Sequence, residues 1–175
     1  MDLKTFNGTV GTIFDKQLAE YGFNLKRKKT ERLYCARIYT TGDRYIKITA
    51  SIHPRDFPPH YNIVLGQGSF EWPECDWNSV ALWRIKNSID PKTNPKEYSL
   101  EQMDLEKLEH SLAHAKNELL NYGHQFLVGE TGFFTSVRSA QNRDREPYKI
   151  HSPTANGGLE TIIDKESKAL KEKFS

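Results

Sequence analysis

Three carboxylates and two tryptophans lie within seven residues near the middle of the chain: Glu71, Trp72, Glu74, Asp76 and Trp77. Sugar-cleaving enzymes use paired carboxylates, one as a general acid and the other as a base or nucleophile, and neighbouring rings fit such a site. Tryptophans inside an acidic rim are also typical of anchors in protein–protein interfaces. A third interpretation is structural, with the tryptophans sealing the edge of the core and the carboxylates in solvent. The residue types alone leave all three interpretations open.

A second group of side chains combines positive charge with aromatic rings on a predicted hairpin. Alternation with a period of two predicts that four of these side chains point outward, and Lys28 in the preceding basic run extends the group. Rings and cations on one face can stack and hold single-stranded bases. Tyrosine and lysine are equally common on the solvent side of any half-exposed strand. The group consists of Lys28, Arg37, Tyr39, Tyr45 and Lys47.

Other reactive side chains give weaker patterns. His110 and His114 have the four-residue spacing by which two imidazoles on a helix can share a metal. The leucine stripe of that helix, however, places them on the solvent side. Cys75 lies between two carboxylates, which raise the pKa of a thiol and favour an inert, part-buried cysteine. We therefore expect no metal site, no cofactor and no catalytic residue.

Two helices are predicted to support these groups. Apolar residues at three- and four-residue steps predict a helix over Leu3–Tyr21, and Gly22 ends it with a left-handed turn. A leucine stripe predicts a longer helix over Leu100–Tyr122. Ser99 and Gln102 have the spacing of a capping box and are predicted to open the longer helix.

The strands follow from alternation of apolar and polar residues. Leu33–Tyr39 and Tyr45–Ile52 form the hairpin, and Tyr61–Leu65 adds a third strand. Val80–Ile85 fits either a fourth strand or a short helix. We therefore expect an α+β fold, in which a three- to four-stranded antiparallel meander sheet carries the N-terminal helix and the long helix on one face.

Chain length and charge distribution bear on domain organisation. A chain of 175 residues favours one domain, which we assign to residues 1–140. Residues 141–175 are predicted to be a basic, partly irregular tail, in which Asp164–Phe174 can form a short helix. Residues 1–60 carry 11 Lys and Arg against 6 Asp and Glu, whereas residues 61–131 carry 6 against 11. Blocks of opposite charge can dock on each other or on a partner.

Composition excludes several classes of protein. Hydrophobic residues make up 37% and charged residues 27% of the chain, which is typical of a globular protein rather than a disordered one. No apolar run approaches the roughly 18 residues of a membrane span, so we expect no membrane partner. Cys35 and Cys75 accompany no export signal, which predicts reduced thiols and a cytoplasmic location.

The order of the segments resembles a known group of proteins. Tyr21–Phe23 after the first helix, then the hairpin, then Asn62–Gly66 before the tryptophan-rich segment are similar to small single-domain bacterial α+β proteins of unknown function, of the immunity type found with polymorphic toxin systems. The similarity covers about residues 5–128. It implies no catalytic residues, and it implies that the acidic segment Glu71–Asp76 covers a basic surface of a toxin.

The favoured interpretation is a non-catalytic protein-interaction module, immunity- or inhibitor-like, that binds a protein partner through Glu71, Trp72, Glu74, Asp76 and Trp77. The alternative is a nucleic-acid-binding protein that uses the basic aromatic face of the sheet. A third hypothesis is a hydrolase with a carboxylate site. The sequence leaves the oligomeric state open.

Overall fold

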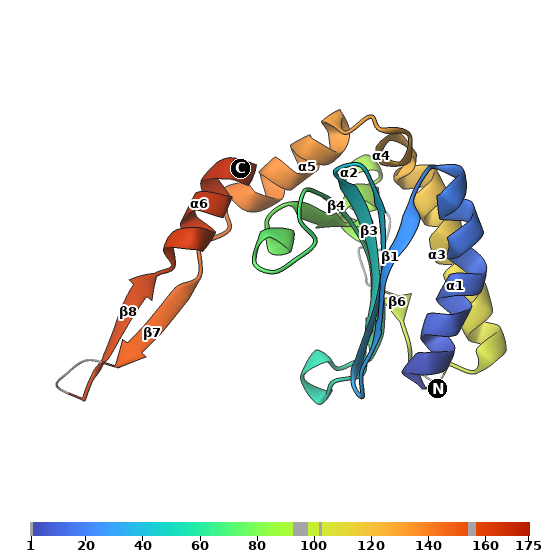
Figure 1. Ribbon diagram of the computed structural model, residues 1–175, viewed down its shortest axis with the longest axis horizontal. Coiled ribbons are helices and arrows are strands. Elements are labelled where there is room, and N and C mark those ends of the chain that lie inside the picture. Colours follow the sequence, from blue (N-terminus) through green and yellow to red (C-terminus); the bar gives the residue numbers. More distant parts are fainter. Residues whose placement is uncertain (1, 93–97, 102, 154–156) are drawn as a thin grey trace.

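The computed structural model describes residues 2–92, 98–101, 103–153 and 157–175 (Figure 1). Its helices are α1 (Leu3–Glu20), α2 (Leu82–Ile89), α3 (Leu105–Tyr122), α4 (His124–Val128), α5 (Gly132–Arg143) and α6 (Lys165–Phe174). Its strands are β1 (Asn24–Thr30), β2 (Tyr34–Thr41), β3 (Arg44–Ser51), β4 (His60–Gln67), β5 (Ser79–Ala81), β6 (Tyr98–Ser99), β7 (Lys149–Pro153) and β8 (Leu159–Ile163). Short 3-10 helices, η1 (Pro54–Asp56) and η2 (Glu74–Asp76), lie in loops.

The described strands form a six-stranded sheet and a separate two-stranded hairpin. In the larger sheet the order is β1-β2-β3-β4-β5, and β6 pairs with another part of β4; all pairs are antiparallel. The predicted α+β class is confirmed, but the sheet has six strands rather than three or four. Strand β1 is exposed along its whole length and lacks apolar alternation, while β5 and β6 are too short to show a period.

Helices α1 and α3 cover one face of the large sheet, as the sequence predicts (Figure 1). Helix α1 begins where the carboxylate of Asp2 accepts hydrogen bonds from the backbone N–H groups of Lys4 and Thr5, both at 2.8 Å. It ends before Gly22, whose φ of +79° favours glycine. Among the described residues, no helix has both the length and the apolar composition needed to cross a bilayer.

Helix α3 starts later than predicted, at Leu105 rather than Leu100. The carboxylate of Asp104 accepts a hydrogen bond of 2.9 Å from the backbone N–H of the third helical residue, so Asp104 is the N-cap. Ser99, the predicted cap, belongs instead to β6. Its predicted capping partner, Gln102, lies outside the described residues.

The hydrophobic core fills the space between the sheet and its helices. Phe14 of α1, Ile46 and Ile63 of the sheet, and Leu112 of α3 are fully buried there. The segment Val80–Ile85, predicted as strand or helix, contains the end of β5 and the start of α2, so each alternative is right for part of it. Both parts contribute side chains to this core.

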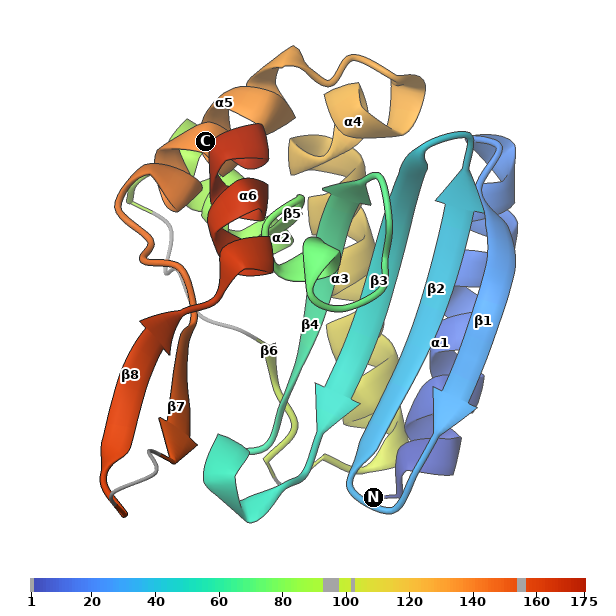
Figure 2. The ribbon, with the colours of Figure 1, turned by 60° about the vertical axis from the view of Figure 1, so that its left-hand side comes forward.

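Residues 144–175, which we call the C-terminal arm, follow α5. The predicted boundary between residues 140 and 141 falls inside α5. The arm contains the β7–β8 hairpin and helix α6, which forms where the sequence predicts a final helix. Leu170 and Phe174 of α6 pack with Trp77 and Tyr148 in a small cluster separate from the main core. Figures 1 and 2 show the hairpin extending away from the large sheet.

Candidate interaction surface

The acidic-aromatic segment, residues 70–78, lies over the face of the sheet that α1 and α3 leave free (Figure 2). Tyr45 of β3 lies beneath it, in edge contact with Phe70 at 6.1 Å between ring centroids. The Tyr45 hydroxyl donates a 2.7 Å hydrogen bond to Asn78. A Cβ atom at Gly66 would lie 2.1 Å from the Tyr45 ring, so glycine allows the ring to lie flat against β4. The segment therefore packs on the sheet rather than standing free in solvent.

Trp77 is not an exposed anchor. Its side chain is 0% exposed and packs with Leu170 and Phe174 of α6. The guanidinium of Arg145 lies 4.3 Å from the centroid of its ring. The prediction that Trp77 contacts a partner directly is wrong, because the C-terminal arm of the same chain covers it. Trp77 is instead a structural residue that holds the C-terminal arm, in a cluster separate from the main core.

Trp72 has the opposite environment. It is 71% exposed, and its ring stacks on the ring of Tyr148 in the C-terminal arm, with centroids 6.1 Å apart and planes 13° from parallel. The Tyr148 hydroxyl donates a 2.6 Å hydrogen bond to Asp76. Burial and this hydrogen bond raise the pKa of Tyr148 to about 12. We call this stacked pair of rings, exposed Trp72 and half-buried Tyr148, the aromatic platform.

Each carboxylate of the acidic-aromatic segment contacts a cation from a distant part of the chain. The pairs are Glu71 with Arg27 of β1 at 2.6 Å, Glu74 with Lys173 of α6 at 3.6 Å, and Asp76 with Arg145 at 3.3 Å. Arg145 also donates a hydrogen bond to the backbone carbonyl of Asp76. The three acids of the acidic-aromatic segment are thus paired with basic side chains of the same chain.

This pairing weakens the hydrolase hypothesis. A general acid on a glycosidase needs a carboxyl group whose pKa is raised. The hydrogen bond from Arg27 instead lowers the pKa of Glu71, an effect that solvent screening keeps small because both side chains are about half exposed. The observed contacts favour a structural role for these acids over acid–base catalysis.

The basic aromatic group does not form one exposed face. Arg37 and Tyr39 point toward α1 and are 6% and 1% exposed, with the Arg37 guanidinium 2.8 Å and the Tyr39 hydroxyl 2.7 Å from the carboxylate of Asp15. Tyr45 is buried on the opposite face and Lys47 is half-buried beside it. The prediction of a shared outward face is wrong, because the ion pair with Asp15 lets β2 turn an arginine toward the helices.

The other candidates are distributed over the surface and the core. Lys28 is exposed on β1, at the edge of the sheet. His114 of α3 lies 3.3 Å from Glu118, and the described residues contain no group of three or more side chains able to hold a metal ion. Cys75 is buried, and burial is the main cause that raises the pKa of its thiol, as expected for an inert cysteine.

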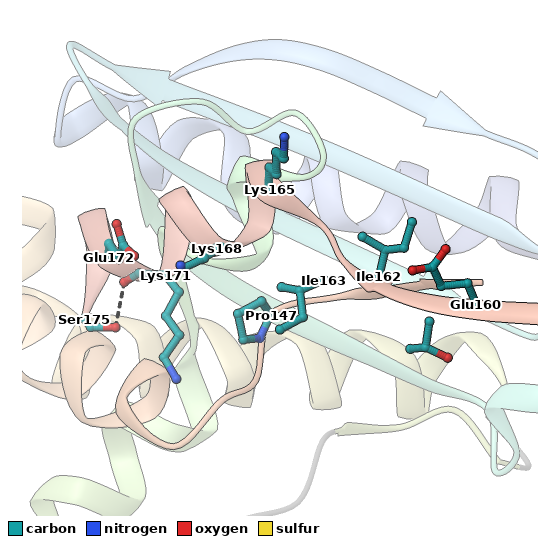
Figure 3. Close-up of a pocket in the computed structure, with 10 residues that line it drawn as sticks. Pro147, Glu160, Ile162, Ile163, Lys165, Lys168, Lys171, Glu172 and Ser175 are labelled. Atoms are coloured by element: carbon teal, nitrogen blue, oxygen red, sulfur yellow. Dashed lines mark hydrogen bonds between the residues drawn. The ribbon is translucent and has the colours of Figure 1, made fainter. Parts of the chain in front are cut away.

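A groove that the sequence did not indicate runs between the β7–β8 hairpin and α6 (Figure 3). Its volume is about 790 Å³. Figure 3 shows Pro147 and Ile163 side by side at its centre, with Lys171 reaching past Pro147. The adjacent isoleucines 162 and 163, followed by lysines at steps of three, are the sequence pattern that marks this place. This sequence pattern does not by itself predict a groove, because it does not show that the hairpin extends away from the core.

Comparisons of the chain with protein-family models, with curated proteins and with solved structures find no match. Function must therefore be inferred from the side chains and contacts described above.

Proposed function

We propose that this chain is a non-catalytic protein-interaction module that binds a protein partner through the aromatic platform. The observation that carries the proposal is the 71% exposure of Trp72, in a side chain already held in place by stacking on Tyr148. Tryptophan and tyrosine are the residues most often found at the energetic centres of protein interfaces. Their rings offer a large apolar area together with few rotatable bonds.

The contacts beneath the platform support this proposal. Tyr148 is tied to Asp76, and Arg145 is bound to the same carboxylate. A surface that is ordered before binding loses less conformational entropy when the partner arrives. Glu71, which directly precedes Trp72, forms an exposed ion pair with Arg27 of β1, and this pair supplies charged groups of the kind found at interface rims.

An inhibitor-like role is the specific form of the proposal that the resemblance implies. In that role the module covers a functional surface of its partner with the platform. The three acids of the segment are paired with cations of the same chain, so apolar contact by the rings supplies more of the affinity than negative charge does.

We expect Trp72→Ala to weaken partner binding by at least about tenfold, because truncation of an interface centre costs about 2 kcal/mol or more. Phe57→Ala is the matched control, since Phe57 is an aromatic residue of similar exposure, 76%, outside the platform. Affinity capture from a nuclease-treated lysate of the source organism identifies the partner. Calorimetry with the purified partner then measures the binding affinity of wild type and of the two variants. Equal affinity of wild type, Trp72→Ala and Phe57→Ala would contradict the proposal.

A further inference from the structure

The β7–β8 hairpin leaves apolar side chains in solvent. Leu159 is 75% exposed and Ile163 is 52% exposed, and Ile150 and Ile162 are nearly as open. No other described strand pairs with either strand of this hairpin. Isolated two-stranded sheets are marginally stable in water, and a third strand or a packed helix is normally needed. The hairpin therefore has the features of a sheet that is completed by another chain.

The groove beside the hairpin follows β8 along its side. Four consecutive residues of β8, 160–163, line it, and consecutive residues of a strand point to opposite faces. A cavity that contacts both faces in this way must pass along the open edge of the strand. Unpaired backbone N–H and C=O groups at such an edge can hydrogen-bond to an added strand.

Helix α6 forms the basic side of the groove. Lys165, Lys168 and Lys171 line it at steps of three residues, and within the described part of the chain none of them forms a salt bridge. A hydrogen bond from Lys149 lowers the pKa of Glu146 and the charge of Lys171 adds to this effect, so this carboxylate lies near one of the three lysines. Lys173, by contrast, is paired with Glu74 of the body. Figure 3 shows Lys165 and Lys171 directed to opposite sides of α6. Two glutamates, at positions 160 and 172, also line the groove, but the lysines outnumber them.

We propose that this groove binds an extended acidic segment of a partner protein, which adds to β8 as a third strand. Backbone hydrogen bonds to β8 supply affinity for any extended peptide. Apolar side chains on one face of the segment pack on Ile163 and Pro147, which lie side by side, and its carboxylates meet the lysines of α6. This inference rests on the proposed function in one respect, namely that the ligand is a protein. It is otherwise independent of it, because the groove and the aromatic platform share no residue.

The test uses the full chain and a fluorescein-labelled synthetic peptide in which valine and glutamate alternate, with fluorescence anisotropy as the readout. We expect saturable binding that weakens as salt is added. The double variant Lys168→Glu/Lys171→Glu lowers the affinity by about tenfold or more, because two attractions become repulsions. The matched control is Lys4→Glu/Lys16→Glu on α1, which changes net charge equally at exposed positions outside the groove, and it keeps wild-type affinity.

A valine–lysine peptide is the reversed-charge probe, and it must bind much more weakly than the valine–glutamate peptide. Absence of saturable binding, equal binding of both peptides, or equal losses in both double variants would overturn the proposal. Sedimentation of the chain alone tests a second copy as the occupant: a dimer that Ile162→Lys dissociates would also overturn it. Trp72→Ala leaves peptide affinity unchanged, so failure at the platform and failure at the groove are distinguishable.

Discussion

Trp77→Ala should lower the free energy of unfolding by about 3–5 kcal/mol, as expected for removal of a fully buried tryptophan. Its side chain is 0% exposed and lies among Leu170 and Phe174 of α6 and the guanidinium of Arg145. The substitution leaves a cavity where the C-terminal arm meets the body. Urea denaturation monitored by circular dichroism measures the loss.

Trp72→Ala is the matched control for this prediction, because the same residue type five positions earlier is 71% exposed. We expect its effect on stability to stay within about 0.5–1 kcal/mol, in the range of surface substitutions. Limited proteolysis adds a local readout: Trp77→Ala should make the arm easier to cleave, since α6 loses a central contact. Equal destabilisation by the two substitutions would mean that Trp77 is not the anchor of the arm.

The elements with strong periodicity could be predicted from the sequence. The stripe of α1 and the alternation of β2, β3 and β4 are local patterns, and the glycine after α1 marks its end. The basic strand β1 and the short strands β5 and β6 could not be predicted, because pairing with their neighbours holds them in place. Local sequence patterns therefore predicted the fold class, the helices on the sheet and its central strands, but not its outer strands.

The side of β2 on which the Arg37 side chain lies was predicted wrongly from the sequence. Arginine on a strand normally indicates the solvent side. Arg37 instead points toward α1, where Asp15, the backbone carbonyl of Asn7 and the Tyr39 hydroxyl satisfy its guanidinium. These partners are brought together only by the packing of α1 on the sheet. Alternation alone cannot distinguish an arginine that is buried against partners on another element from an arginine on the surface.

The candidate site was predicted in part for a similar reason. The segment 70–78 was identified from its composition, but its two tryptophans differ completely in exposure. The difference comes from the C-terminal arm, which contacts both rings and supplies cations to two of the acids. The opposite charges of the middle and the end of the chain indicated that such docking was possible. They did not indicate which ring would remain in solvent.

The second large effect concerns a buried ion pair between α2 and α3. Glu118 is 8% exposed, accepts a hydrogen bond from Lys86, and accepts a 2.6 Å hydrogen bond from the Tyr98 hydroxyl. Glu118→Gln removes the negative charge and leaves Lys86 mostly buried without its counter-ion. Breaking one side of a buried pair costs about 3–5 kcal/mol, and we expect about 3 kcal/mol because Lys86 keeps some access to water.

A double variant separates the charge effect from a packing effect. Lys86→Met/Glu118→Leu replaces both charged groups with apolar ones of similar volume, and we expect it to recover a large part of the stability lost in Glu118→Gln. Urea denaturation of the three proteins under one buffer gives the comparison. If the double variant is less stable than Glu118→Gln, shape rather than charge determines the energetics at this position.

The same pair makes stability depend on pH. Burial raises the pKa of Glu118, but the hydrogen bonds from Lys86 and Tyr98, helped by the lysine charge, outweigh burial and lower it below its ordinary value of 4.5. The folded state therefore keeps the carboxylate charged at a pH where the unfolded chain begins to protonate it. Its contribution to stability is complete above 4.5 and is lost as the pH falls through the lower pKa of the folded state.

The free energy of unfolding of wild type minus that of Glu118→Gln should thus shrink as the pH falls below 4.5. Denaturation series at several pH values measure this difference directly, and the subtraction removes contributions from carboxylates common to both proteins. A difference that stays constant down to about pH 3 would show that Glu118 is not stabilised in its charged form by Lys86 and Tyr98. A difference in unfolding free energy that grows as the pH falls from about 5 to 3 would mean that burial, not pairing, dominates the pKa of this carboxylate.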